Sequence, residues 1–245
     1  MQAFRSLLFN NIFFGTSAIF LVAALLLLLF PRHAAQKCFH IWMKYMMWLL
    51  RVLVGLDYKI VGAEHLPDGP VIVACKHQST WDVGIFLILF SNPAYVLKKE
   101  LLSIPVYGWL LRKTKMISIN RDGGASALRK MLLQSREALA LGRTVVIFPE
   151  GTRSAPDSRG TYHPGVAALY NISNVPLVPV ALNSGCFWER RGFIKRPGTI
   201  TLEFQPPIDK GLKTREFMEE LEFRIETASK KLRRATRWDH RPIHL

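Results

Sequence analysis

The sequence has few cysteines and few acidic residues. Its three cysteines, Cys38, Cys75 and Cys186, lie far apart and form no C-x-x-C pair, which argues against a disulfide-stabilised scaffold and a structural zinc site. Only 18 Asp and Glu residues oppose 33 Lys and Arg residues, so the 245-residue chain carries a formal charge of +15. This charge predicts an acidic partner, but it does not distinguish nucleic acid, anionic lipid and acidic protein.

The N-terminal region also contains a long stretch that lacks charged residues. No charged residue occurs at positions 6–31, and positions 12–30 are almost wholly apolar, with five consecutive leucines at 25–29. About 20 apolar residues, at about 1.5 Å of helix each, match a hydrocarbon core of about 30 Å. A cleaved signal peptide would have an apolar core of only about 7–15 residues, followed by a small-x-small cleavage site. The segment is therefore predicted to span a bilayer or to embed deeply in one.

The next stretch, residues 39–56, is also apolar but is interrupted by Lys44 and Arg51. Its Trp and Tyr side chains favour the headgroup level of a bilayer, where the two cations can reach lipid phosphates. Residues 1–56 are therefore predicted to form a membrane-anchoring helical hairpin. Cations lie on both sides of the first helix, so the positive-inside rule says little about orientation.

From residue 57 to residue 245 the sequence alternates between β-rich runs and helical patterns. The predicted strands are 58–61, 71–75, 95–97, 116–119, 144–148, 177–182 and 199–204. The predicted helices are 81–89, 101–113, 125–141, 165–172 and 214–236. This alternation predicts an α/β domain with a mostly parallel or mixed sheet covered by helices.

Polar residues that could carry chemistry directly follow the strand predicted at 71–75. His77 lies in the turn after this strand, where open α/β sheets place their active sites. On a continuous helix His77 and Asp82 would lie about 140° apart, so they meet only if a turn intervenes. Asp82 could then accept from one imidazole nitrogen and leave the other free to take a proton. The alternative is a loop histidine beside an unrelated aspartate at a helix start.

The sequence Phe-Pro-Glu-Gly-Thr-Arg-Ser at 148–154 follows another predicted strand. Its carboxylate, hydroxyls and guanidinium can hold a phosphate beside a hydroxyl-bearing carbon, because Arg matches phosphate geometry and a carboxylate accepts from an OH group. Two looser features accompany it. Arg121 follows the strand predicted at 116–119, and prolines at 176 and 179 predict that the 175–181 segment is an edge or irregular strand.

Together these four elements resemble the four motifs of the glycerolipid acyltransferase family, in particular the lysophosphatidic acid acyltransferase type. His-x4-Asp and Phe-Pro-Glu-Gly-Thr-Arg-Ser are jointly very specific, whereas the other two match by order and spacing. One departure is Lys76, which precedes the histidine where the family often has Asn. The resemblance implies that His77 is the general base and that Asp82 orients it. It also implies an acceptor site formed by Glu150, Gly151, Thr152 and Arg153, a phosphate contact from Arg121, and an acyl-donor side that includes Val178 and Pro179.

The implied reaction moves a fatty acyl group from acyl-CoA or acyl-acyl carrier protein to the sn-2 hydroxyl of 1-acyl-glycerol-3-phosphate, giving phosphatidic acid. No metal or cofactor beyond the acyl donor is implied. Because both donors are cytosolic, the α/β domain is expected on the cytoplasmic face of the membrane. Residues 85–87 and 104–109 are candidates to surround the acyl chain, although all could be core.

Several alternatives remain open. The acceptor could be another lysolipid or glycerol-3-phosphate, and water could replace the acceptor in a phospholipase-type hydrolysis. Cys75 could act as a thiol nucleophile. A non-enzymatic alternative is a membrane-tethered protein that binds anionic lipid. A nucleic-acid partner is disfavoured, because the chain has no P-loop or recognised binding signature and its aromatic residues concentrate in the predicted hairpin.

Overall fold

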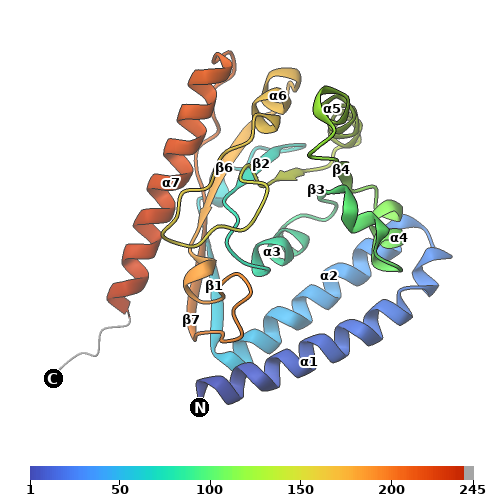
Figure 1. Ribbon diagram of the computed structural model, residues 1–245, viewed down its shortest axis with the longest axis vertical. Helices are drawn as coiled ribbons and strands as arrows, with labels where there is room; N and C mark the ends of the chain where they lie inside the picture. The colour runs from blue at the N-terminus through green and yellow to red at the C-terminus, as the bar shows by residue number, and fades with distance from the viewer. Residues whose placement is uncertain (240–245) are drawn as a thin grey trace.

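The computed structural model describes residues 1–239; residues 240–245, the end of the predicted α/β domain, lie outside the described part. Within the described part, seven strands form one sheet in the order β1-β7-β6-β2-β5-β3-β4 (Figure 1). Most neighbours are parallel but β6 and β7 are antiparallel, so the sheet is mixed, as predicted. The strands are β1 (Leu56–Val61), β2 (Ile72–Cys75), β3 (Ala94–Lys98), β4 (Ile117–Ile119), β5 (Val145–Ile147), β6 (Leu177–Leu182) and β7 (Gly198–Phe204).

Helices cover both faces of the sheet. Side chains alternate across a strand, so Val73 and Cys75 of β2 pack into one hydrophobic cluster and Ile72 and Ala74 into another. The first cluster includes side chains from α1, α2 and α3, and the second includes side chains from α5, α6 and α7. The helices are α1 (Gln2–Ala23), α2 (Arg32–Leu49), α3 (Trp81–Leu89), α4 (Tyr107–Lys113), α5 (Gly124–Ala140), α6 (Gly165–Ile172) and α7 (Thr214–Asp239).

Every predicted strand and helix of the α/β part occurs, but the helix predicted at 101–113 is divided. A 3-10 helix covers Lys99–Ser103, and α4 begins at Tyr107. Pro105 disfavours helical backbone at the residue before it, and Ile104 is extended, with ψ at 123°. One proline therefore separates the two helical pieces.

The prediction that the 175–181 segment is an edge or irregular strand rather than a central one is wrong about its place in the sheet. β6 lies between β7 and β2, and all of its residues are buried. The ladder of β6 with β7 covers only Val180 to Leu182, so Pro179 and its missing N–H lie just outside it. The Pro179 carbonyl still accepts a hydrogen bond from Gln205 N–H at 2.9 Å. A proline is tolerated in this central strand because it falls where the neighbouring ladder has already ended.

α1 and α2 form the predicted hairpin, but the first helix lies nearer the N-terminus than the predicted 12–30. α1 ends at Ala23, and a 3-10 turn at Leu26–Leu28 leads to Pro31, which precedes α2. Pro31 disfavours helical backbone at Phe30, and the run of leucines before it forms the connection between the helices. By length and composition α1 could cross a membrane, since its apolar window has a mean hydropathy of 1.6 and only 17% of that window is buried.

The hairpin packs tightly on the rest of the protein. Phe9 of α1 and Met46 and Met47 of α2 belong to the same hydrophobic cluster as Ile85 and Phe86 of α3. Figure 1 shows α3 between the sheet and α2. Side chains of the hairpin and of the sheet belong to one hydrophobic core. The division of the chain into an anchoring hairpin and an α/β domain at residue 56 therefore stays a prediction.

Arg143, immediately before β5, is a buried cation that joins several loops. Its guanidinium donates to Asn92 Oδ1 at 2.9 Å, and to the carbonyls of Pro93, Thr114 and Lys115 at 2.8 to 3.1 Å. Burial lowers the pKa of Arg143 to about 10, so the guanidinium stays charged at neutral pH.

Arg143→Met is expected to lower the free energy of unfolding by about 3 kcal/mol, because it leaves these buried acceptors without a donor. Denaturant-induced unfolding in detergent measures the change. Arg136→Met on the exposed face of α5 is the matched control and should change stability by less than about 0.5 kcal/mol. Equal stability of the two variants would contradict this role of Arg143.

Candidate active site

The two most specific motifs meet at one edge of the sheet. β2 and β5 are parallel neighbours, with Ala74 paired to Ile147. Their carboxyl ends therefore lie side by side, although 73 positions separate His77 from Glu150. This is the edge where open α/β sheets place their active sites.

His77 and Asp82 form a hydrogen-bonded pair. His77 Nδ1 lies 3.0 Å from Asp82 Oδ2. The predicted turn makes the contact possible, because residues 77–80 are not helical and α3 begins only at Trp81. We assign the proton to Nδ1, because the carboxylate is an acceptor, and this leaves the lone pair of Nε2 free to take a proton. The His77 side chain is 15% exposed, so a substrate can reach it.

Asp82 is fully buried, and its hydrogen bonds offset the cost of burying a charge. Oδ2 also accepts from the backbone N–H groups of Gln78 at 2.7 Å and Ser79 at 2.8 Å. Oδ1 accepts from Ser184 Oγ at 2.5 Å. Ser184 could not be recognised from the sequence, because 102 positions separate it from Asp82 and no spacing rule connects them.

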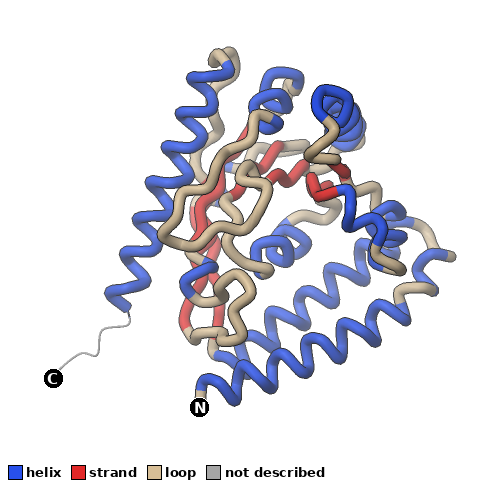
Figure 2. The backbone as a smooth tube through the Cα atoms, viewed as in Figure 1, coloured by secondary structure: helices blue, strands red, loops and turns tan. Residues whose placement is uncertain are grey.

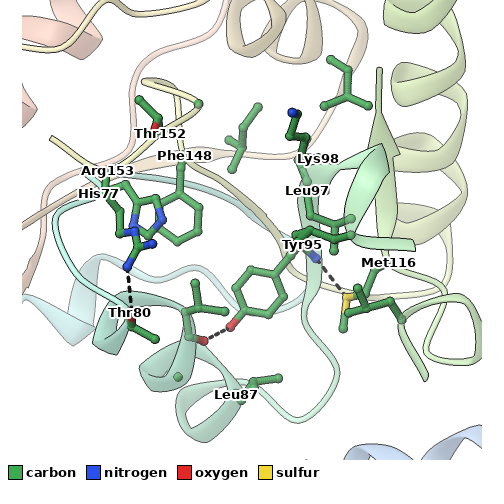
Figure 3. Close-up of a pocket in the computed structure, with 18 of the residues that line it drawn as sticks. His77, Thr80, Leu87, Tyr95, Leu97, Lys98, Met116, Phe148, Thr152 and Arg153 are labelled. Carbon is green, nitrogen blue, oxygen red and sulfur yellow. Dashed lines mark hydrogen bonds between the residues drawn. The ribbon is translucent and has the colours of Figure 1, made fainter. Parts of the chain in front are cut away.

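The residues after β5 hold His77 in place. Its backbone N–H donates to Glu150 Oε2 at 3.0 Å, and its carbonyl accepts from the Ser154 N–H at 2.8 Å. Its ring stacks on Phe148 with centroids 4.2 Å apart and planes at 24° (Figure 3). The backbone and the ring of His77 are therefore both positioned by the second motif.

Glu150 lies behind His77. It is almost fully buried, and its second carboxylate oxygen accepts from Lys76 Nζ at 3.4 Å. The resemblance implies a contact between Glu150 and the acceptor, but both oxygens of this carboxylate are engaged with His77 and Lys76. Its neighbours in the motif, Gly151 to Arg153, face the cavity instead.

A cavity of about 880 Å³ adjoins His77. Its walls are mostly apolar, and Figure 3 shows Leu97 and Met116 across the cavity from His77. Two of the residues suggested to surround an acyl chain, Leu87 and Tyr107, line this cavity, whereas Ile85 and Phe86 are core residues. Further apolar wall residues are Phe13, Trp42, Met43, Met47, Tyr95, Val96 and Leu111. The size and lining suit the hydrocarbon chain of a lipid.

Two arginines give the cavity a positive side. Arg153 donates to Thr80 Oγ1 at 2.8 Å, as Figure 3 shows, and Arg121 donates to the Gly151 carbonyl. Burial and the neighbouring Arg190 lower the pKa of Arg153, yet a guanidinium stays protonated at neutral pH. Arg121, Gly151, Thr152 and Arg153 all line the cavity, so the structure brings them together near His77.

The structure does not bring Val178 and Pro179 to this site. Both lie in the central strand β6, and Val178 is part of the hydrophobic core. In the part of the chain that the structure describes, neither residue lines the cavity.

Cys75 has the character of a buried core residue. It is fully buried, and its thiol donates to the Lys76 carbonyl at 3.1 Å. Burial and the Asp82 carboxylate raise the pKa of Cys75 well above the usual value of a thiol. These properties disfavour the thiolate that a nucleophile requires.

Comparisons with known proteins identify the family. A family model described as Acyltransferase matches residues 57–183. The chain is 35% identical to a 1-acyl-sn-glycerol-3-phosphate acyltransferase of Pseudomonas aeruginosa, over 85% of this chain and 82% of the relative. It is 30% identical to a lyso-ornithine lipid O-acyltransferase of the same organism, over 56% of this chain and 52% of that protein.

The fold is similar to that of the 1-acyl-sn-glycerophosphate (LPA) acyltransferase PlsC from Thermotoga maritima. The TM-score is 0.73 and the sequence identity 24%, over 95% of this chain and 98% of that chain. The family match covers about half of the chain, and the first relative aligns along most of its length. The protein therefore belongs to the acyltransferase family and is an enzyme that transfers acyl groups.

Proposed function

We propose that the enzyme transfers a fatty acyl group from a thioester to the sn-2 hydroxyl of 1-acyl-glycerol-3-phosphate, which gives phosphatidic acid. The observation that carries the proposal is the free Nε2 of His77 beside an apolar cavity with two arginines in its wall. The name of the Pseudomonas aeruginosa relative, 1-acyl-sn-glycerol-3-phosphate acyltransferase, supports the choice of acceptor.

In the proposed reaction, His77 Nε2 takes the proton of the acceptor hydroxyl as the hydroxyl oxygen attacks the thioester carbonyl carbon. The new ester C–O bond forms, the C–S bond breaks, and the imidazolium returns its proton to the leaving thiolate. Asp82, bonded to Nδ1, keeps the ring oriented and stabilises the imidazolium. Direct attack by the acceptor needs no acyl-enzyme.

The phosphate of the acceptor binds between Arg121 and Arg153 in this proposal. Both guanidinium groups line the cavity, and a guanidinium can bind two phosphate oxygens at once. Gly151 and Thr152 complete the acceptor site from the same loop. The acyl chain occupies the apolar part of the cavity.

The membrane supplies the acceptor, and the cytosol supplies the donor. The long apolar α1 and the exposed aromatic residues of α2, Tyr45 and Trp48, support insertion of the hairpin into a bilayer. We place the α/β part on the cytoplasmic side, because both acyl-CoA and acyl-acyl carrier protein are cytosolic. The thioester is a co-substrate, and the chemistry requires no further cofactor.

A different acceptor is the second candidate. One relative is named lyso-ornithine lipid O-acyltransferase, so the names of the relatives include more than one lysolipid acceptor. A lysolipid without a phosphate would use His77 and the apolar cavity but not the two arginines.

The test is to incubate the purified protein in liposomes with lysophosphatidic acid and an acyl thioester, and to detect phosphatidic acid by mass spectrometry. Acyl-CoA and acyl-acyl carrier protein are supplied separately, and other lysolipids and glycerol-3-phosphate replace the acceptor in parallel. Phosphatidic acid formation supports the proposal. Product from another acceptor alone, or release of free fatty acid alone, would overturn the proposed acceptor or the transfer.

Arg153→Ala is expected to raise the KM for lysophosphatidic acid by about 10-fold or more, since a charge-assisted hydrogen bond contributes about 1.5–3 kcal/mol. The kcat should change less, and monoacylglycerol, which lacks the phosphate, should be used equally by variant and wild type. Arg159→Ala is the matched control, because Arg159 lies on the same loop but pairs with Glu222 of α7. An unchanged KM would remove Arg153 from phosphate binding.

A further inference from the structure

A buried lysine lies directly before His77. Lys76 is 1% exposed, and its ammonium group donates to Glu226 Oε1 at 2.6 Å, to the Ser158 carbonyl at 3.3 Å and to Glu150 Oε1 at 3.4 Å. These partners lie on different segments: Glu150 and Ser158 on the loop between β5 and α6, and Glu226 on α7. The lysine therefore joins the end of β2 to a loop and to the last helix.

In this cluster hydrogen bonds join one cation, Lys76, to two carboxylates, those of Glu150 and Glu226. Tyr162 adds a hydrogen bond from its hydroxyl to Glu226 Oε1 at 3.1 Å. Burial, together with Glu226 and Glu150, raises the pKa of Tyr162, so the phenol remains a neutral donor. A buried ammonium needs such partners, because an unpaired buried charge is strongly destabilising.

One carboxylate of the cluster continues to the reacting histidine. Glu150 Oε1 accepts from Lys76 while its Oε2 accepts from the His77 backbone N–H. Glu226, Lys76, Glu150 and His77 therefore form an unbroken chain of contacts from α7 to the general base. Figure 2 shows the loop between β5 and α6 running beside α7, where Arg159 also pairs with Glu222.

We propose that Lys76 and Glu226 are positioning residues for acyl transfer, and that α7 is thereby part of the catalytic apparatus. They act through Glu150, which fixes the His77 backbone and hence the direction of Nε2. This inference rests on the proposed role of His77 as the base. It assigns a positioning role to two side chains that do not line the cavity, one of which, Lys76, stands where the family often has Asn.

The charged groups near His77 lead to a second measurable effect, a change in the pH dependence of kcat/KM. The ionisable groups bonded around this histidine are Asp82 on α3, Lys76 at the end of β2, Glu150 and Arg153 on the loop, and Glu226 behind Lys76. Arg121 and His163 line the same cavity beside Gly151, and none of the variants changes them. An anion stabilises protonated imidazole and a cation destabilises it. Glu226→Gln should therefore move the acid limb of the kcat/KM profile to lower pH, and Lys76→Met should move it to higher pH. Each shift should be a few tenths of a pH unit, in the range of about 0.2–0.5.

The experiment compares two matched glutamates one turn apart on α7. Glu226→Ala is expected to lower kcat by about 10-fold with the acceptor KM changed by less than about 2-fold, because positioning affects the transition state more than ground-state binding. Glu226→Gln, which keeps the oxygen acceptor, should restore most of kcat and still show the shift in pH. Glu222→Ala and Glu222→Gln remove only the pair with Arg159 and should leave kcat, KM and pH profile unchanged.

Thermal unfolding of each variant separates positioning from stability. Glu226 is 23% exposed, so its variants are expected to fold. Gly160→Ala is an independent variant: its new Cβ would lie 2.5 Å from Glu150 Oε1, so it disturbs Glu150 without changing any charge. It should lower kcat without the shift in pH. A lower melting temperature with kcat and pH profile unchanged in the Glu226 variants would overturn the proposal, whereas an inactive wild type would overturn the proposed function itself.

Discussion

His77→Ala is expected to lower kcat by about 10²-fold or more, because general-base catalysis contributes rate enhancement of this size. The loss should appear with every acyl donor, since the base acts on the acceptor hydroxyl. Membrane association should not change, because His77 follows the central strand β2 at its carboxyl end and is not part of the hairpin. Phosphatidic acid formation and flotation with liposomes measure the two properties.

A histidine outside the cavity provides the control. His65 ends a 3-10 helix after β1, contacts the Phe204 carbonyl at 2.9 Å and does not line the cavity, so His65→Ala should keep full turnover. Folding of the His77 variant is checked by its melting temperature. A folded His77→Ala protein with wild-type turnover would remove the imidazole from the mechanism.

Asp82→Ala is expected to lower both kcat, by about 10²-fold or more, and the free energy of unfolding, by about 2–4 kcal/mol. The stability loss follows from the Gln78 and Ser79 N–H groups and the Ser184 hydroxyl, which lose their shared acceptor in a buried site. The loss in kcat follows from the orientation and charge that the carboxylate gives to His77.

Asp82→Asn separates these effects. The amide has nearly the same shape and retains one oxygen acceptor, so less stability should be lost than with Ala. It cannot stabilise the imidazolium, so kcat should fall about as far as with Ala. Single-turnover rates and denaturant unfolding of both variants test this. An Asn variant with wild-type kcat would contradict the role of Asp82.

The sheet and helices could be predicted from the sequence because their signals are local. Short β-rich runs, most of them bounded by turn residues, predicted the strands, and α3 and α6 occur with the predicted bounds. The position of β6 could not be predicted, because the cost of Pro179 depends on where the ladder with β7 ends. The end of α1 was also missed, since an apolar run does not show which of its leucines form the turn before Pro31.

Part of the candidate site could likewise be predicted from the sequence, and part could not. The His77–Asp82 pair and the loop with Arg153 lie within short segments, so their spacing along the chain identified them. The contacts of Ser184 with Asp82, and of Glu226 with Lys76, join residues 102 and 150 positions apart. Such contacts depend on the order of strands in the sheet and on the path of α7, which hydrophobic patterning does not specify.

The shared core of the hairpin and the sheet has a consequence for modularity. Phe13, Trp42, Met43 and Met47 of the hairpin form part of the cavity wall, and Gly84 of α3 allows Met43 to pack closely against it. A tethering segment that only carried a catalytic domain could be exchanged or deleted without altering what that domain binds. Here the first two helices supply part of the cavity wall, so substitutions in them are expected to change which acyl chains the cavity accepts.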